Sequence, residues 1–134
     1  MSQTAPAKRP EFSCSMPPRV EELPAVRADL RAWLSDLDVP EPAAEDIVLA
    51  AWEVCANAIE HPVTPDQDVA VEAKALPRGI RIVVCDAGTW KSRRLLRPNR
   101  GLGLRLIEGL VDRMSIKRGL GQTEVVLFRC TRHA

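Results

Sequence analysis

The sequence predicts an α+β domain in which helices are layered on one face of a mixed, mostly antiparallel sheet. Strand-like segments follow one another in pairs joined by short turns, and two amphipathic helices precede the first such pair. Strands and helices do not alternate as they do in doubly wound folds. The 134 residues suffice for one hydrophobic core. We therefore expect a single domain over residues 12–134, after a disordered polar tail at residues 1–11.

The first half of the chain predicts an edge strand and two helices. The segment EFSCSM, residues 11–16, is expected as a short edge strand because two prolines close it. A second helix is expected to start near Pro42 and to end at about His61, before another proline. The first helix is expected between Pro24 and Pro40, where apolar residues recur at the spacing of one helical face: Val26, Leu30, Trp33, Leu34 and Leu37.

The second half of the chain predicts four strands and a third helix. The first two strands are joined by the hairpin connector Pro77-Arg78-Gly79. A basic, proline-containing stretch follows them and is expected as a loop. In order, the expected elements are a turn at 63–68, strands at 69–76 and 79–88, a loop at 89–101, a helix at 103–114, and strands at 114–119 and 123–130.

Composition and cysteine spacing limit the class of protein. A net charge of +1 argues against nucleic-acid binding by bulk charge. No apolar run reaches membrane-spanning length, and the N-terminus lacks the apolar core of a signal peptide, so a cytoplasmic protein is expected. Cys14, Cys55, Cys85 and Cys130 are scattered without a C-x-x-C pair, and three lie in apolar segments. Buried reduced thiols are therefore favoured over a zinc site.

The second helix carries an unusual group of polar residues. Glu53, Asn57 and His61 follow at i, i+4 and i+8 on one face, and Glu60 lies close by. A solvated helix face is one explanation. However, asparagine is unfavourable within a helix because its side chain competes for backbone hydrogen bonds. The other explanation is a magnesium site, because an amide oxygen beside a carboxylate suits Mg²⁺ that shares phosphate oxygens.

Two further stretches carry candidate ligand-binding groups. Asp86 ends an apolar strand and is followed by Gly88. Either it opens an Asx-type turn, or its carboxylate accepts a hydrogen bond from the exocyclic amine of a flat ring that Gly88 allows to approach. Gly101 and Gly103 open the third helix, where free N–H groups bind phosphate well. A G-x-G pair alone is weak evidence for such a site.

Taken together, the three stretches resemble the anti-sigma regulatory factors, which are serine/threonine kinases of the Bergerat-type ATP-binding fold. That fold is shared with gyrase, heat-shock chaperones and histidine kinases. EVCANAIEH resembles the family's N box, DAGTW its G1 box, RGLGLRLI its G2 box and GQTEV its closing Gly-x-Thr element. Their order and spacing agree with the family over roughly residues 12–130. The resemblance implies a cytoplasmic, magnesium- and ATP-dependent transferase that regulates transcription by sequestering a sigma factor and phosphorylating an anti-sigma factor antagonist.

The resemblance also implies a role for each matching residue. Glu53 would be the catalytic general base, and Asn57 would coordinate Mg²⁺. Asp86 would hold the adenine amine, helped through a water by Thr123. Backbone N–H groups at the start of the third helix would contact the phosphates. The further nucleotide-binding positions that it implies are Gly88, Trp90, Arg100, Gly101, Leu102, Gly103 and Leu104.

Several alternatives stay open at this point. Trp90 stands where a small residue is common in the superfamily, so it either stacks near the nucleotide or covers the edge of the core. The stretch between Gly88 and Gly101 would be the lid, and its basic residues either neutralise triphosphate charge or form a solvated loop. No helical dimerisation segment carries a phosphoacceptor histidine, which makes a histidine kinase a weak interpretation. The basic residues of the lid are Lys91, Arg93, Arg94, Arg97 and Arg100.

Two other functions compete with the kinase. One is a non-catalytic ATP-binding interaction module that switches by lid ordering, and the other is a detached ATPase domain. The presence of Glu53 favours the kinase, because a pure binder needs no base at that position. Because family members commonly dimerise, the resemblance also predicts a homodimer. Direct nucleic-acid and membrane partners are not expected.

Overall fold

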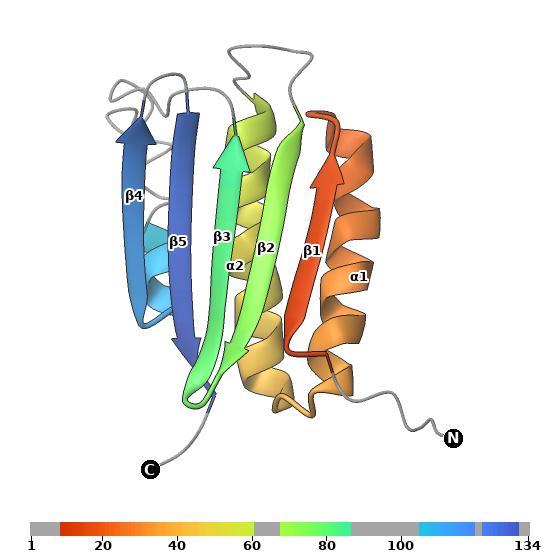
Figure 1. Cartoon of the computed structure of the whole chain (residues 1–134), viewed down its shortest axis with the longest axis vertical. Coiled ribbons are helices and arrows are strands. Elements are labelled where there is room, and N and C mark those ends of the chain that lie inside the picture. Colours follow the sequence, from red (N-terminus) through yellow and green to blue (C-terminus); the bar gives the residue numbers. More distant parts are fainter. Residues whose placement is uncertain (1–8, 61–67, 87–104, 120–121, 132–134) are drawn as a thin grey trace.

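The computed structural model describes residues 9–60, 68–86, 105–119 and 122–131. The strands form one five-stranded sheet in the order β1-β2-β3-β5-β4, and all four described pairings are antiparallel (Figure 1). The predicted α+β architecture is confirmed, with an antiparallel rather than mixed arrangement of the described strands. The elements are β1 (Glu11–Met16), η1 (Val20–Glu22), α1 (Leu23–Asp36), α2 (Glu41–Glu60), β2 (Val69–Leu76), β3 (Gly79–Asp86), β4 (Arg113–Gly119) and β5 (Gln122–Cys130).

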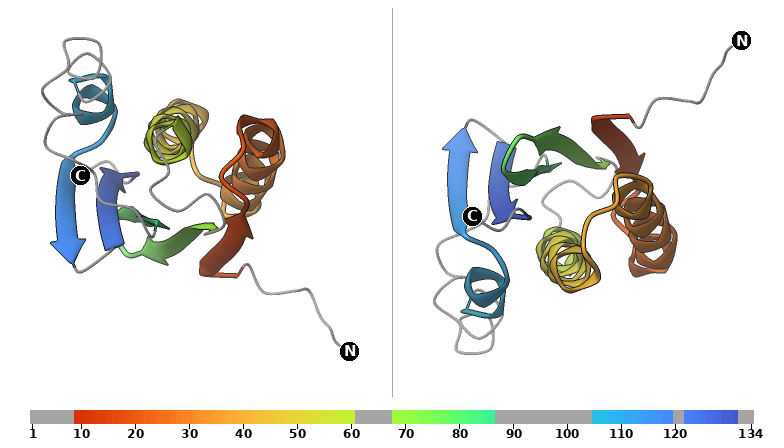
Figure 2. Two further views of the ribbon diagram at one scale, coloured as in Figure 1. Left: turned by 90° about the horizontal axis from the view of Figure 1, so that it is seen from above. Right: turned by 90° about the horizontal axis from the view of Figure 1, so that it is seen from below.

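The helices lie on one face of this sheet. Figure 2 shows α1, α2 and the helical residues 105–110 on the same side of the strands. Both predicted helix starts are confirmed, because Pro24 lies in the first turn of α1 and α2 begins one residue before Pro42. Between the two helices the chain turns at Asp38, whose φ of 59° is one that aspartate tolerates better than most residues. No helix in the described ranges is long and apolar enough to cross a membrane.

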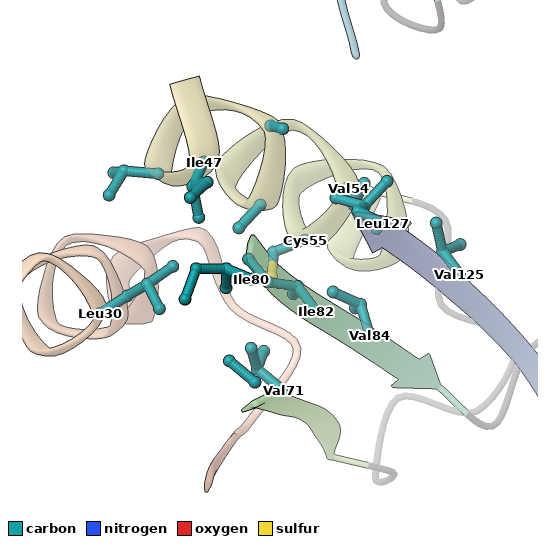
Figure 3. Close-up of a cluster of buried hydrophobic side chains, with 14 of the residues drawn as sticks. Leu30, Ile47, Val54, Cys55, Val71, Ile80, Ile82, Val84, Val125 and Leu127 are labelled. Carbon is teal, nitrogen blue, oxygen red and sulfur yellow. The ribbon is translucent and has the colours of Figure 1, made fainter. Parts of the chain in front are cut away.

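Side chains along each strand point alternately to the two sides of the sheet, so that one face belongs to the core and the other is open. Ile80, Ile82 and Val84 of β3 point toward α2, and Figure 3 shows them in one cluster with buried side chains of the helix. The intervening strand residues point the other way, where no described helix covers them. We call that surface the open face; it includes Glu11, Ala70, Arg81, Arg113 and Gln122.

The N-terminal segment joins the fold earlier than the predicted tail at residues 1–11 allows. β1 begins at the last of these residues. The indole Nε1 of Trp33 donates a 2.9 Å hydrogen bond to the carbonyl of Arg9. The backbone N–H of Ala75 donates to the carbonyl of Pro10 at 2.7 Å. Both donors are distant in sequence, so the composition of the segment gave no sign of these contacts.

The third helix ends earlier than predicted. The described helical residues are 105–110, and β4 begins at Arg113 rather than after Met114. The change occurs at Asp112, whose backbone N–H donates to the carbonyl of Phe128 on β5 at 2.8 Å. The helical spacing of apolar residues continues past this point, but pairing with β5 overrides it. Residues 63–67 of the turn expected at 63–68, and the loop expected at 89–101, lie outside the described residues.

The hairpin between β2 and β3 is confirmed, with a different role for its glycine. Pro77 and Arg78 form the turn, and Gly79 is already part of β3. A Cβ atom at Gly79 would overlap the carbonyl oxygen of Arg129 and lie 2.9 Å from the Cα of Cys130. Because only glycine lacks that atom, β3 and β5 approach closely at this end of the ladder.

The cysteines are all free thiols, but they differ in burial. Cys55 is buried on α2, as the sequence predicted. Cys14 and Cys85 are half-buried, and Cys130 is exposed at the end of β5, which departs from the prediction. Burial raises the pKa of the Cys55 thiol to about 12, with the nearby Cys14 as a second cause. Cys55 therefore stays protonated at neutral pH and belongs to the core rather than to a reactive site.

Candidate functional site

The candidate site begins at one end of the β3–β5 ladder. Asp86 is the last residue of β3, and its Cα partner across the ladder is Thr123 of β5. Two residues further along, Val84 and Val125 are also Cα partners and are buried in the core. Since side chains alternate along a strand, Asp86 and Thr123 belong to the helix-covered side of the sheet. The structure thus brings together two residues to which the resemblance assigns adenine recognition.

The second helix carries the other candidate residues to the same end. α2 and β3 run in the same direction, so the C-terminal half of α2 lies near the end of β3 (Figure 1). Glu53 and Asn57 are one helical turn apart on α2. Between them in sequence, Val54 is fully buried in the same cluster as Val84 and Val125 (Figure 3). Glu53 and Asn57 therefore lie beside the apolar core rather than on a part of α2 remote from it.

Burial distinguishes the site from the rest of the core. Among the residues that the structure describes, only two polar side chains are buried: Asn57 at 6% exposed and Thr123 at 1%. Burying a polar group costs free energy unless it finds partners, so most cores avoid it. Asn57 is thus not part of a solvated helix face, which removes that explanation for it. Glu53, half-buried beside it, keeps partial access to solvent.

The oxygen donors at this end suit a hard cation. Within the described ranges no three His, Cys, Asp or Glu side chains group together as a metal site. The candidate donors that the resemblance assigns to α2 are the amide of Asn57 and the carboxylate of Glu53. A donor set of this kind fits Mg²⁺, which keeps several waters and completes its shell with phosphate oxygens.

A cation–π contact supports the turn of α2 that carries Glu53, and no local sequence pattern predicts it. The guanidinium carbon of Arg27 lies 4.4 Å from the centroid of the Trp52 ring. Arg27 is on α1 and Trp52 is next to Glu53 on α2, so the contact holds the two helices together beside the candidate base. A stacked guanidinium contributes about 0.5–1 kcal/mol at an exposed site. Only the folded chain brings the two residues together.

An ion pair fixes the start of α2 above the sheet, and it too was not predicted. The guanidinium of Arg129 on β5 lies 3.0 Å from the carboxylate of Asp46. Its buried Nε has no hydrogen-bond partner within the described part of the chain. Because Asp46 and Asn57 are on the same rigid helix, this contact helps to set where Asn57 lies over β5.

The remaining predicted positions lie outside the described residues and stay predictions. They include the histidine of the N box, most of the G1 box and the glycine-rich start of the third helix. These positions are His61, Gly88, Trp90, Arg100, Gly101, Leu102, Gly103 and Leu104.

The fold and the position of the site define a Bergerat-type ATP-binding domain, as the sequence predicted. The chain belongs to the histidine kinase-like ATPase domain family, whose model matches residues 16–129. It is also similar to the crystal structure of the RsbU and RsbW domains of Rv1364c from Mycobacterium tuberculosis, with a TM-score of 0.76 and 30% sequence identity. That similarity covers 94% of this chain and 34% of the mycobacterial chain, so this chain spans about a third of the length of the chain it matches. The match agrees with the resemblance to anti-sigma regulatory factors.

Proposed function

We propose that the protein is an ATP- and Mg²⁺-dependent serine/threonine kinase that acts as an anti-sigma factor. It would sequester a sigma factor and phosphorylate an anti-sigma factor antagonist. The observation that supports this most is the burial of Asn57 and Thr123 near the end of β3 that carries Asp86. Buried polar side chains are uncommon in an apolar core, and departures of this kind are expected at functional sites. The family match and the similarity to a structure that contains an RsbW domain support the same conclusion.

Adenine recognition is assigned to the pair across the β3–β5 ladder. The carboxylate of Asp86 accepts a hydrogen bond from the exocyclic amine of adenine, and the hydroxyl of Thr123 assists through a water. Their cross-strand pairing supports this assignment, because it places both side chains on the covered side of the sheet. Guanine presents a carbonyl where adenine presents the amine, so the carboxylate would repel it. The pair therefore selects ATP over GTP.

Phosphoryl transfer is assigned to Glu53 and Asn57, which lie one helical turn apart on α2; we call this segment the polar turn. Bound Mg-ATP supplies the γ-phosphoryl group and the cation that neutralises its charge. The amide oxygen of Asn57 would hold the cation, and the carboxylate of Glu53 would accept the proton of the acceptor hydroxyl. The acceptor oxygen would form the new bond to the γ-phosphorus while the bond to the β-phosphate breaks and ADP leaves. Backbone N–H groups of residues 101–104 would bind the phosphates. Such a reaction needs positioning and charge neutralisation more than covalent chemistry, which suits residues on a rigid helix.

The proposed partners are proteins rather than nucleic acids or membranes. They are a sigma factor, its antagonist, and a second copy of the chain in a homodimer. The acceptor side chain would be a serine or threonine of the antagonist. The competing function, a non-catalytic ATP-binding module, would bind the same partners but would not need the carboxylate of Glu53.

A transfer assay with Glu53→Gln separates the two functions. The antagonist protein and γ-labelled ATP are incubated with the wild type, with Glu53→Gln and with Glu41→Gln. Loss of a general base should slow transfer roughly 10²–10⁴-fold while nucleotide affinity stays nearly unchanged. Glu41→Gln is the matched control, because it changes an exposed glutamate in the first turn of the same helix.

The assay also tells which part of the proposal fails. If the wild type transfers phosphate to no antagonist, the kinase is excluded and the ATP-binding module takes its place. If Glu53→Gln transfers at the wild-type rate, a kinase remains but Glu53 is not its base.

A further inference from the structure

The open face of the sheet carries two adjoining grooves. The larger has a volume of about 720 Å³, and the smaller, toward β1, has a volume of about 360 Å³. Arg81 borders both, so together they form one depression across the strands, which we call the sheet groove. The described helices all lie on the other side of the sheet (Figure 2). The side chains that line the larger part are mainly Leu76, Arg81, Arg113, Ser115, Val126 and Phe128.

An apolar strip flanked by two arginines forms the floor of the larger part. Phe128 on β5 is the Cα partner of Arg81 on β3 and of Arg113 on β4. Val126, two residues earlier on β5, points to the same side and extends the apolar strip. Phe128 and Val126 are half-buried, whereas both arginines are exposed. The strip is thus accessible and has a guanidinium on each side.

The sheet groove is lined by three carboxylates, Glu11, Glu72 and Asp112, as well as by Lys74, Arg81 and Arg113, but its larger part has only one of these carboxylates beside its two arginines. In the described part of the chain, no ion pair joins Arg81 or Arg113 to a carboxylate. Asp112 borders the groove, but its carboxylate accepts a 2.7 Å hydrogen bond from the backbone N–H of Cys130. Lys74, further toward β1, has Glu11 at 3.9 Å. The larger part therefore has two guanidinium groups against the single carboxylate of Asp112, and this net positive charge attracts negative charge.

The length of the groove indicates which kind of ligand would fit it. The groove spans five strands, which corresponds to about 19 Å at a spacing of about 4.8 Å between strands. An extended polypeptide of about six residues has this length at about 3.3 Å per residue. A compact small molecule would fill only one of the two parts. An extended segment of a protein matches the length of the whole groove, and a segment with acidic residues matches the positive charge of its larger part.

We propose that the sheet groove binds an extended acidic segment of a partner protein. An apolar side chain of that segment packs on Phe128 and Val126, and carboxylates on either side of it pair with Arg81 and Arg113. This inference goes beyond the kinase function and does not depend on it. Asn57 and Thr123 lie on the covered side of the sheet, so a partner in the groove leaves the nucleotide site accessible.

Fluorescence anisotropy with a labelled peptide, Gly-Glu-Ser-Leu-Ser-Glu-Gly, tests the proposal. In an extended chain its leucine and both glutamates point to one side, as the groove requires. We expect a dissociation constant on the order of 10⁻⁴ M that rises with salt, because exposed ion pairs are weak and screened. Arg113→Glu should weaken binding roughly five- to tenfold.

A matched control and a charge swap make the test specific. Lys117→Glu makes the same charge change on the same strand and the same face but outside the groove, and it should leave the affinity unchanged. A peptide with lysine in place of both glutamates should prefer Arg113→Glu to the wild type. Arg113→Glu should also bind ATP as the wild type does, which keeps this result separate from that of the proposed kinase.

Three outcomes would overturn the proposal. The first is no binding of the acidic peptide up to about 1 mM, the limit of weak recognition. The second is an equal loss of affinity in Arg113→Glu and Lys117→Glu, which would indicate attraction by overall charge. The third is self-association by light scattering that Phe128→Glu abolishes, because the occupant of the face would then be a second copy of the chain.

Discussion

The two ends of the β3–β5 ladder share the same strands and are covered by the same helix, yet they are built differently. At the hairpin end, Gly79 faces Cys130 with no space for a side chain, so the strands meet by close backbone packing. At the other end, Asp86 faces Thr123, and polar groups enter the core near Asn57. The hairpin end is closely packed, as expected of a stable core, whereas the other end buries polar side chains, which a stable core normally excludes. Departures of this kind are expected at functional sites, which agrees with the proposed nucleotide site at this end.

The largest effect is expected at the polar end. Asp86→Asn removes a charge-assisted hydrogen bond to adenine, which should cost about 1.5–3 kcal/mol of ATP binding, or roughly 10- to 150-fold in affinity. GTP binding should not fall in parallel, so discrimination between the two nucleotides decreases. Calorimetric titration of both nucleotides measures this. An unchanged ATP affinity in a folded variant would remove Asp86 from the site.

The hairpin end should respond in stability instead. Gly79→Ala forces a Cβ atom against the backbone of Arg129 and should lower the free energy of unfolding by about 1–3 kcal/mol. Gly109→Ala is the matched control, because nothing lies within 4 Å of the added atom and alanine is the better helix former. Urea denaturation measures both. If Gly79→Ala is as stable as Gly109→Ala, close packing does not govern this end.

A smaller effect is expected where α1 supports the polar turn. Arg27→Ala removes the guanidinium from the Trp52 ring and should lower the free energy of unfolding by about 0.5–1 kcal/mol. Arg27→Lys keeps a cation near the ring but loses the planar contact, so it should fall between the wild type and Arg27→Ala. Thermal denaturation of the three proteins tests this order. Equal stability of all three would show that the contact does not support α2.

Local patterns predicted most of the fold. Apolar spacing located α1 and α2, and the turn chemistry of Pro77 and Arg78 located the β2–β3 hairpin. Where the prediction failed, a distant partner decided the outcome. Pairing with Phe128 ended the third helix before Met114, and the indole of Trp33 holds residue 9 against the fold. Such contacts do not follow from the composition of one segment.

The residues of the candidate site were predicted from their motifs, but the contacts that hold α2 in position were not. Glu53, Asn57, Asp86 and Thr123 were identified in the sequence, and the ladder places the last two as cross-strand partners. The burial of Asn57 could not be seen, because a polar residue on an amphipathic helix is normally solvated. The contacts that position α2, Arg129 with Asp46 and Arg27 with Trp52, join segments far apart in the chain and carry no local signal.

The most direct test of the nucleotide site is a calorimetric titration of ATP into the wild type, Asn57→Ala and Asn57→Asp, with and without Mg²⁺. If the amide oxygen of Asn57 holds the cation, Mg²⁺ should strengthen ATP binding to the wild type. Asn57→Ala should lose that gain, by at least about tenfold in affinity, and Asn57→Asp should keep it because its carboxylate is still an oxygen ligand. Without Mg²⁺ the wild type and Asn57→Ala should bind ATP alike, whereas Asn57→Asp should bind it more weakly because its carboxylate repels the phosphates. The same Mg²⁺-dependent gain in a folded Asn57→Ala protein would contradict the assignment of this end of the ladder as the nucleotide site.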